Sequence, residues 1–226
     1  MNLAAIAVHV LTALGAVLAL LATLAVAEGR YEMVFVWLGA ALVVDGIDGP
    51  IARAVGVKQR LPRFSGEILD LVVDYLTYVF VPVLALLAAG RLPEGSALVF
   101  AAAILLSSLF HFSDTASKSE DLAFVGFPAV WNIVAFYIFA LDLPRGVAAV
   151  VTGVAVALTF VPLHWVHPMR VTAARPLTLA ATALWSLAAA AAVWHGFPAP
   201  PLAQMALGAV ALYGIALSLW LSRRPV

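Results

Sequence analysis

The chain of 226 residues contains no cysteine and few charged residues. Without cysteine there is no disulfide bond and no thiolate metal ligand, so any metal ion must be held by oxygen or imidazole groups. Asp, Glu, Lys and Arg together make up 11% of the residues, and no Lys or Arg precedes Arg30. Because a cleaved secretory signal starts with basic residues, we expect the N-terminal apolar segment to be the first helix of the mature chain.

Apolar residues are abundant instead. They make up 65% of the chain, and the mean hydropathy of +1.08 excludes an ordinary soluble domain. Apolar runs of about the 20 residues that cross a bilayer predict an all-α integral membrane protein with about eight transmembrane helices. These helices are expected at residues 3–27, 31–55, 66–89, 96–112, 127–141, 146–166, 176–194 and 202–221. No linker interrupts them, so we predict a single membrane-embedded domain over residues 1–226.

The distribution of Lys and Arg predicts the orientation of these helices. Alternate connections carry nine of the twelve basic residues, namely Arg53, Lys58, Arg60, Arg63, Lys118, Arg170, Arg175, Arg223 and Arg224. The other side has only Arg30, Arg91 and Arg145. Since basic loops stay in the cytoplasm, both termini are expected there, with the basic connection at 54–65 on the same side.

Four aspartates interrupt the second and third apolar segments. Asp45 and Asp48 are three residues apart, and Asp70 and Asp74 four apart, so each pair lies on one face of its helix. An ionised carboxylate inside a membrane helix costs roughly 2.5–3.5 kcal/mol even on insertion scales. The 54–65 connection can return the chain so that the two faces meet, and a cluster of four carboxylates then requires bound cations. Oxygen ligands favour a hard divalent ion, and two such ions about 4 Å apart form a clamp for phosphoryl chemistry.

Small residues accompany the aspartates at Gly46, Gly49, Ala52 and Gly66. They allow either a ligand to approach the backbone or two membrane helices to pack closely, and both interpretations stay open. Intramembrane carboxylates also mark the ion pathways of transporters. A carrier would place them near the midplane in matching halves of the chain, whereas here they belong to one helical hairpin, which favours an enzyme.

The segment 45–53, DGIDGPIAR, together with Gly66, Asp70 and Asp74, resembles the signature of the CDP-alcohol phosphotransferases. Twelve residues separate Arg53 from Gly66, more than in most members of that family. This gap, the additional Gly46 and the eight expected helices resemble the bacterial branch that makes phosphatidylcholine.

The resemblance implies transfer of the phosphatidyl group from CDP-diacylglycerol to choline, with release of CMP. It also implies a divalent cation, Mn²⁺ or Mg²⁺, and a homodimer. With the orientation predicted from Lys and Arg, we expect the protein in the bacterial inner membrane with its site facing the cytoplasm, and we expect no nucleic-acid partner. By position, the metal ligands are Asp45, Asp48, Asp70 and Asp74, with Asp74 also the general base, and the CDP-binding residues are Gly49, Ala52, Arg53 and Gly66. His9 and Thr12 on the first helix either face the cytidine or make internal hydrogen bonds.

The acceptor alcohol is less clearly encoded. Choline would be recognised by aromatic faces and a nearby carboxylate, and a lipid phosphate by a basic residue. Candidates on the expected cytoplasmic side are Tyr75, Tyr78, Asp114, Lys118, Trp131 and Asn132. The aromatic residues are equally typical of the belt at a membrane interface. A related enzyme that uses serine, inositol or glycerol phosphate is therefore the alternative function, followed by a proton-coupled transporter.

Overall fold

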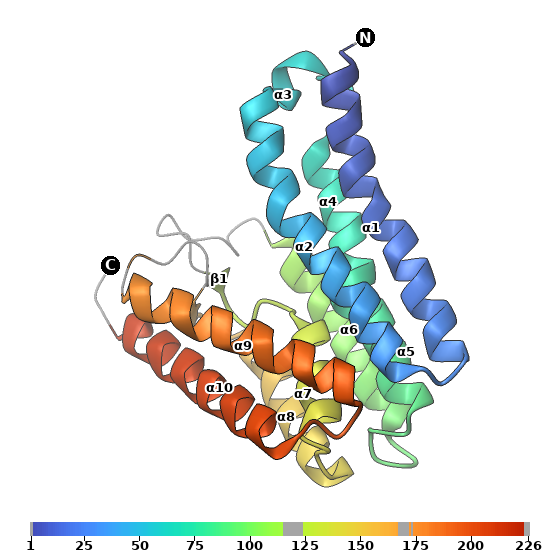
Figure 1. Ribbon diagram of the computed structural model, residues 1–226, viewed down its shortest axis with the longest axis vertical. Helices are drawn as coiled ribbons and strands as arrows, with labels where there is room; N and C mark the ends of the chain where they lie inside the picture. The colour runs from blue at the N-terminus through green and yellow to red at the C-terminus, as the bar shows by residue number, and fades with distance from the viewer. Residues whose placement is uncertain (1, 115–123, 167–171, 173, 224–226) are drawn as a thin grey trace.

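The computed structural model describes residues 2–114, 124–166, 172 and 174–223, which form a bundle of helices (Figure 1). Its elements are α1 (Leu3–Ala27), α2 (Tyr31–Val55), α3 (Val57–Arg60), α4 (Gly66–Asp74), the π-helix η1 (Tyr75–Phe80), α5 (Val81–Ala88), α6 (Ala97–Ser113), β1 (Phe124–Val125), α7 (Trp131–Ala140), α8 (Arg145–Leu158), β2 (His164–Trp165), α9 (Arg175–His195) and α10 (Pro201–Ser222). The two short strands pair antiparallel, with Phe124 opposite Trp165. The predicted all-α class is confirmed.

Six of the eight predicted segments match the helices to within one residue at each end, if α4, η1 and α5 are counted as the one helix Gly66–Ala88. Five helices in the described part are long and apolar enough to cross a membrane: α1, α2, Gly66–Ala88, α9 and α10. The helices α6, α7 and α8 are apolar but have only 17, 10 and 14 residues. The chain is thus a multi-pass membrane protein in which some apolar helices are shorter than a full span.

Two predicted segments were too long. The segment 127–141 is helical only from Trp131, because Pro128 and the positive φ of Ala129 precede the helix. The segment 146–166 leaves the helix after Leu158, and Pro162 prevents the helix from resuming. The connection at 54–65, expected to be a loop, contains the single turn α3.

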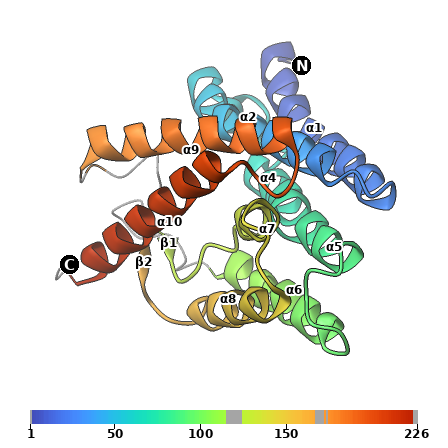
Figure 2. The same cartoon turned by 60° about the horizontal axis from the view of Figure 1, so that its bottom comes forward.

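The short helix α7 lies at the centre of the bundle. Figure 2 shows it nearly end-on, with α5, α6 and α8 on one side and α9 and α10 on the other. Its side chains are buried around most of its circumference, which is typical of a core helix. Phe136 and Phe139 of this helix pack edge-on against Phe35 of α2, with ring centroids 5.4 Å apart in both pairs.

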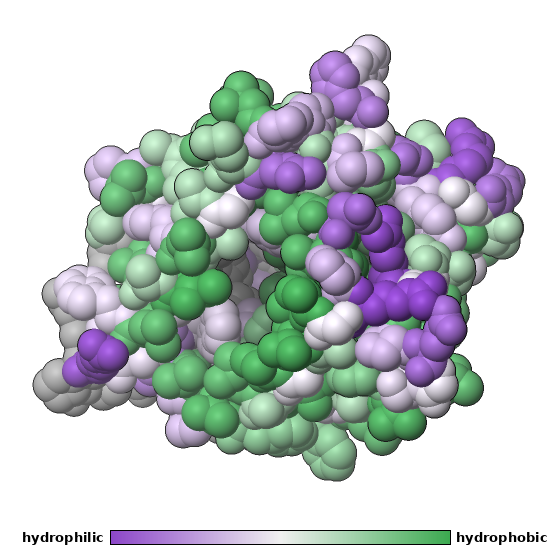
Figure 3. Space-filling view, turned by 90° about the horizontal axis from the view of Figure 1, so that it is seen from below, coloured by the Kyte–Doolittle hydropathy of each residue, from purple (hydrophilic) through white to green (hydrophobic). Residues whose placement is uncertain are grey.

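The outer surface is largely apolar, as a membrane protein requires. Exposed side chains include Leu20 on α1, Leu187 and Trp194 on α9, and Leu202 and Leu212 on α10, at 57%, 71%, 86%, 79% and 70% of their full accessibility. Figure 3 views the end of the molecule opposite the N-terminus, where hydrophilic residues are densest on one side and hydrophobic residues cover much of the remaining surface. Large exposed apolar patches are rare on soluble monomers, so a surface of this kind indicates contact with lipid.

Close approach of α1 to α4 depends on Gly15. A β-carbon at this position would lie 2.4 Å from Cγ1 of Val73, well inside van der Waals contact. Membrane helices approach closely where one of them lacks a side chain. As a result α1, which carries none of the signature residues, packs directly against the helix that holds Asp70 and Asp74.

Candidate functional site

Three of the four aspartates converge between α2 and α4. Asp45, Asp70 and Asp74 are half-buried, and each offers a carboxylate oxygen such that all three oxygens lie within 4.8 Å of one another. Asp70 and Asp74 share a face of α4 because they are four residues apart. The expectation that the acidic faces of the two helices meet is therefore confirmed for these three residues.

Asp48 occupies a different environment from the other three. Its side chain is buried, with 6% exposure, and its Oδ2 accepts a hydrogen bond of 2.6 Å from the hydroxyl of Thr12 on α1. It still lines the same small cavity as the three converging aspartates. Of the two interpretations of Thr12, the internal hydrogen bond is the one found in the structure, and it joins α1 to the signature helix α2.

Asp45 also has a hydroxyl partner. The phenol of Tyr78 donates a hydrogen bond of 2.7 Å to Oδ2 of Asp45. Tyr78 lies in the π-helix η1, directly after Asp74 and α4, where Val81 donates to the carbonyl of Leu76 five residues earlier. Pro82 follows at once and has no N–H with which to form the α-helical bond to the Tyr78 carbonyl. π turns of this kind are frequent at functional sites.

The converging carboxylates fit a divalent cation. They supply only oxygen ligands, which suit hard ions such as Mg²⁺ and Mn²⁺, and half-burial lets an ion enter. A bound ion would also offset the repulsion among ionised carboxylates held this close together. The donor set thus supports a divalent metal without distinguishing between the two ions.

The residues assigned to CDP lie toward the end of α2 and at the start of α4, the ends of these helices that are expected to face the cytoplasm. Arg53 is exposed in the last turn of α2, with its Nη1 3.4 Å from where a β-carbon of Gly49 would be. A β-carbon on Gly66 would lie 3.3 Å from Cε1 of His9, so this glycine allows α4 to approach α1. Among the described residues nothing lies within 4 Å of a β-carbon on Gly46, so packing against them does not explain that glycine.

His9 differs from Thr12 in its bonding. Its Nε2 is buried and has no hydrogen-bond partner among the described residues. Its ring contacts Phe64 edge-on, with centroids 6.4 Å apart. For His9, the internal hydrogen bond that was one of the two interpretations is therefore not observed at Nε2.

The residues proposed for the alcohol or the lipid phosphate are spread over several environments. The phenol of Tyr75 is half-buried and donates to the carbonyl of Leu105 on α6. Trp131 is fully buried and donates its indole N–H to Ser108, and Asn132 is buried with its Oδ1 accepting the N–H of Ile133. Asp114 is exposed at the end of α6. Lys118 lies outside the described residues.

These candidate residues differ in how close they lie to the carboxylate group. Tyr78 directly contacts a carboxylate of the cluster, whereas Trp131 forms part of the core beside Phe127, with ring centroids 5.2 Å apart. Their roles toward an alcohol stay predictions.

The sequence alone did not single out Gly15 as a residue of the site, although it lines the cavity of the aspartates. Its position three residues after Thr12, on the same face of α1, was the available signal.

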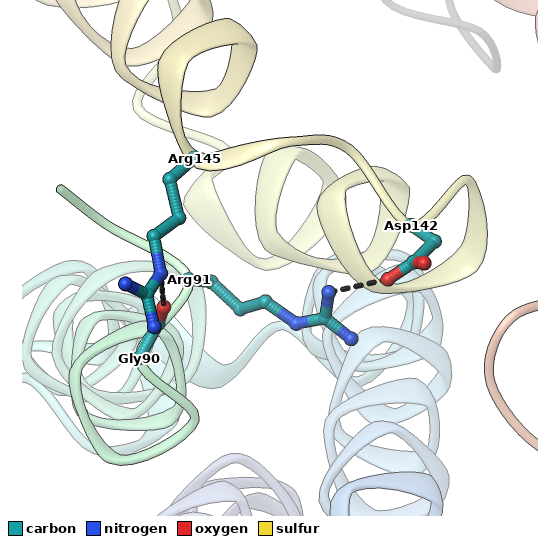
Figure 4. Close-up of polar contacts among 4 residues, drawn as sticks. All are labelled: Gly90, Arg91, Asp142 and Arg145. Carbon is teal, nitrogen blue, oxygen red and sulfur yellow. Dashed lines mark hydrogen bonds and ion pairs between the residues drawn. The ribbon is translucent and has the colours of Figure 1, made fainter.

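A second polar group joins the α5–α6 and α7–α8 turns, which lie at the end of the bundle away from the N-terminus (Figure 1 and Figure 4). Arg91 donates to Asp142, and Arg145 donates to the carbonyl of Gly90 and forms an ion pair with Glu94. The guanidinium of Arg91 also lies over the ring of Phe139, 5.0 Å from its centroid. Gly90, Arg91, Asp142 and Arg145 border a cavity of about 480 Å³ whose lining contains none of the signature residues. Their charges pair with one another, so the group fastens the α5–α6 turn to the α7–α8 turn.

Fold and site together define a multi-pass helical membrane protein with a carboxylate cluster, suited to a divalent ion, between its second and third long helices. The model of the family described as CDP-alcohol phosphatidyltransferase matches residues 4–161. The chain therefore belongs to this family, as the resemblance of the signature implied.

Curated relatives are similar over most of the chain. A phosphatidylcholine synthase from Rhizobium meliloti is 44% identical over 209 residues, which cover 92% of this chain and 87% of the relative. One from Pseudomonas aeruginosa is 42% identical over 217 residues, or 96% and 91% of the two chains. A more distant one from Borreliella burgdorferi is 29% identical over 175 residues, or 77% and 75%.

Proposed function

We propose that this enzyme makes phosphatidylcholine by transferring the phosphatidyl group from CDP-diacylglycerol to choline, with release of CMP. Family membership supports the reaction class, and the names and high coverage of the relatives support choline as the acceptor. The single observation that carries the chemistry is the convergence of Asp45, Asp70 and Asp74 within 4.8 Å.

In this reaction the hydroxyl oxygen of choline forms a bond to the phosphorus of the phosphatidyl group. The bond from that phosphorus to the bridging oxygen of the pyrophosphate breaks, and CMP leaves with the bridging oxygen. The proton of the attacking hydroxyl must be removed, and Asp74 is our candidate general base because it belongs to the cluster and lies at the junction with η1. Direct transfer needs no covalent enzyme intermediate.

A divalent ion, when bound, would neutralise the pyrophosphate and the charge that grows on the departing CMP. Asp45, Asp70 and Asp74 would hold it, and Asp48 would complete the acidic wall from its buried position beside Thr12. Gly49, Ala52, Arg53 and Gly66 are the candidates for holding the nucleotide. The exposed guanidinium of Arg53 is suited to a phosphate oxygen.

We further propose that the protein lies in the bacterial inner membrane with the aspartates toward the cytoplasm. The basic residues of α3 and its flanks support this orientation. The helix α3 lies at the same end of the bundle as the N-terminus (Figure 1), and basic connections of membrane proteins stay in the cytoplasm. A homodimer, implied by the family resemblance, is part of the same proposal, and its test is the mass of the purified protein in detergent.

The function is tested by CMP release from purified protein in detergent with CDP-diacylglycerol and Mn²⁺. We expect release with choline and not with serine, inositol, glycerol 3-phosphate or no alcohol. Release with another alcohol would keep the reaction class and reject choline. Absence of CMP release under every condition, from protein shown to be folded, would favour the transporter alternative.

The carboxylates are tested separately with Asp70→Asn and Asp74→Asn. Each is expected to lower turnover at least about a hundredfold, because a metal ligand or the general base is lost. Asp142→Asn is the matched control, since it makes the same change at the opposite end of the bundle and should keep full activity. Near-normal turnover in Asp70→Asn and Asp74→Asn would refute the proposed mechanism.

A further inference from the structure

Two hydroxyl groups hold two of the four aspartates, and they come from different helices. Thr12 on α1 donates to Asp48, and Tyr78 in η1 donates to Asp45. Only Asp45 of these two acids belongs to the group whose oxygens lie within 4.8 Å of one another. The hydrogen bond from Tyr78 therefore acts on a carboxylate that faces the other two.

The position of Asp45 makes its orientation important. Asp70 and Asp74 belong to one helix face, so their spacing is fixed by α4 itself, whereas Asp45 is the only member of the group on α2. Its carboxylate must be turned toward α4 by side-chain torsions. A hydrogen bond of 2.7 Å to one of its oxygens restricts that rotation.

The turn that carries Tyr78 makes a further hydrogen bond within its own helix. Thr77, the neighbour of Tyr78, is buried and donates to the carbonyl of Val73 at 3.0 Å. The π turn widens the helix between Asp74 and Pro82, so side chains there point in directions that an uninterrupted α-helix would not give them. From this turn the phenol of Tyr78 reaches across to Asp45, the single member of the carboxylate group on α2.

We propose that Tyr78 is a positioning residue that orients Asp45 toward the divalent ion, rather than an alcohol contact. This proposal rests on the metal site of the proposed function. Hydrogen-bond partners behind a metal ligand typically account for about 10- to 100-fold in metal affinity or activity. Tyr78→Phe keeps the ring and its packing and removes only the donated hydrogen bond.

The test is a titration of purified protein in detergent with Mn²⁺ alone, followed by the electron paramagnetic resonance signal of the free ion. We expect Tyr78→Phe to weaken Mn²⁺ binding about tenfold or more. The matched control is Tyr137→Phe, which also loses a phenol hydrogen bond, but to the backbone carbonyl of Leu207 on α10, and it should bind Mn²⁺ like the parent. Circular dichroism and elution volume check that both variants are folded.

Activity separates positioning from alcohol binding. At saturating Mn²⁺, Tyr78→Phe should recover most of its turnover with an unchanged KM for choline. A raised KM for choline with unchanged Mn²⁺ affinity would overturn the proposal and make Tyr78 an alcohol contact. The variant Asp45→Asn tests the metal site itself. If Asp45→Asn binds Mn²⁺ normally, the metal ligation of the proposed function fails, whereas normal binding by Tyr78→Phe alone refutes only the positioning role.

Discussion

The close approach of α1 to α4 at Gly15 gives the sharpest test of how the fold supports the site. In Gly15→Ala the new β-carbon would lie 2.4 Å from Cγ1 of Val73, whereas carbon atoms in contact are about 3.5–4.0 Å apart. Val73 cannot turn away cheaply, because a valine in a helix has one strongly preferred rotamer. The helix α1 must therefore move away from α4.

The expected magnitude follows from two opposing effects. Overpacking of this kind costs about 1–3 kcal/mol, while replacing glycine by alanine inside a helix gains about 0.8–1.0 kcal/mol. Gly39→Ala on α2 is the matched control, because no atom of the part of the chain that the structure describes lies within 4 Å of its new β-carbon, and only the gain applies. The Gly15 variant should thus be less stable than the Gly39 variant by about 1–3 kcal/mol.

Thermal unfolding in detergent measures this difference, at roughly 2–4 °C of apparent Tm per kcal/mol for a chain of this size. Turnover should fall as well, because displacement of α1 moves Thr12 away from Asp48, and a misplacement of about 1 Å can cost on the order of a hundredfold. Adding Val73→Ala removes the clashing methyl group and should restore part of both losses. Equal stability of the Gly15→Ala and Gly39→Ala proteins would refute the close approach.

Two other predictions address the first helix and the orientation in the membrane. Thr12→Val should lower turnover and destabilise the protein by about 1–3 kcal/mol, because the buried carboxylate of Asp48 loses the hydrogen bond from Thr12. The control Thr23→Val loses only a hydrogen bond to the carbonyl of Ala19 on the same helix and should keep its activity. Equal losses in the two variants would contradict a specific role for Thr12. Because the chain has no cysteine, single introduced cysteines report the orientation of the chain in the membrane directly. Glu94→Cys should react with a membrane-impermeant maleimide on intact spheroplasts, whereas Lys58→Cys should react only after lysis. The reverse pattern would invert the proposed orientation.

Much of the architecture was predictable from the sequence because membrane helices are specified locally. A long apolar run in lipid must satisfy its own backbone hydrogen bonds, so its composition and length predict a helix without knowledge of its neighbours. This logic predicted α1 and α2 to the residue. It failed for α7, whose short helix depends on burial at the centre of the bundle rather than on spanning lipid.

The sequence by itself determined the class of protein, its signature and the pairing of aspartates on helix faces, because each depends on composition or on spacing within one segment. Only the tertiary structure decided how the four acids divide. Asp48 accepts a hydrogen bond from Thr12, while Asp45 accepts one from Tyr78 and lies close to Asp70 and Asp74. These contacts join residues 36 and 33 positions apart, and they depend on how closely the helices approach and on the π turn. Local periodicity encodes neither the distance between helices nor the direction of a side chain beyond such a turn.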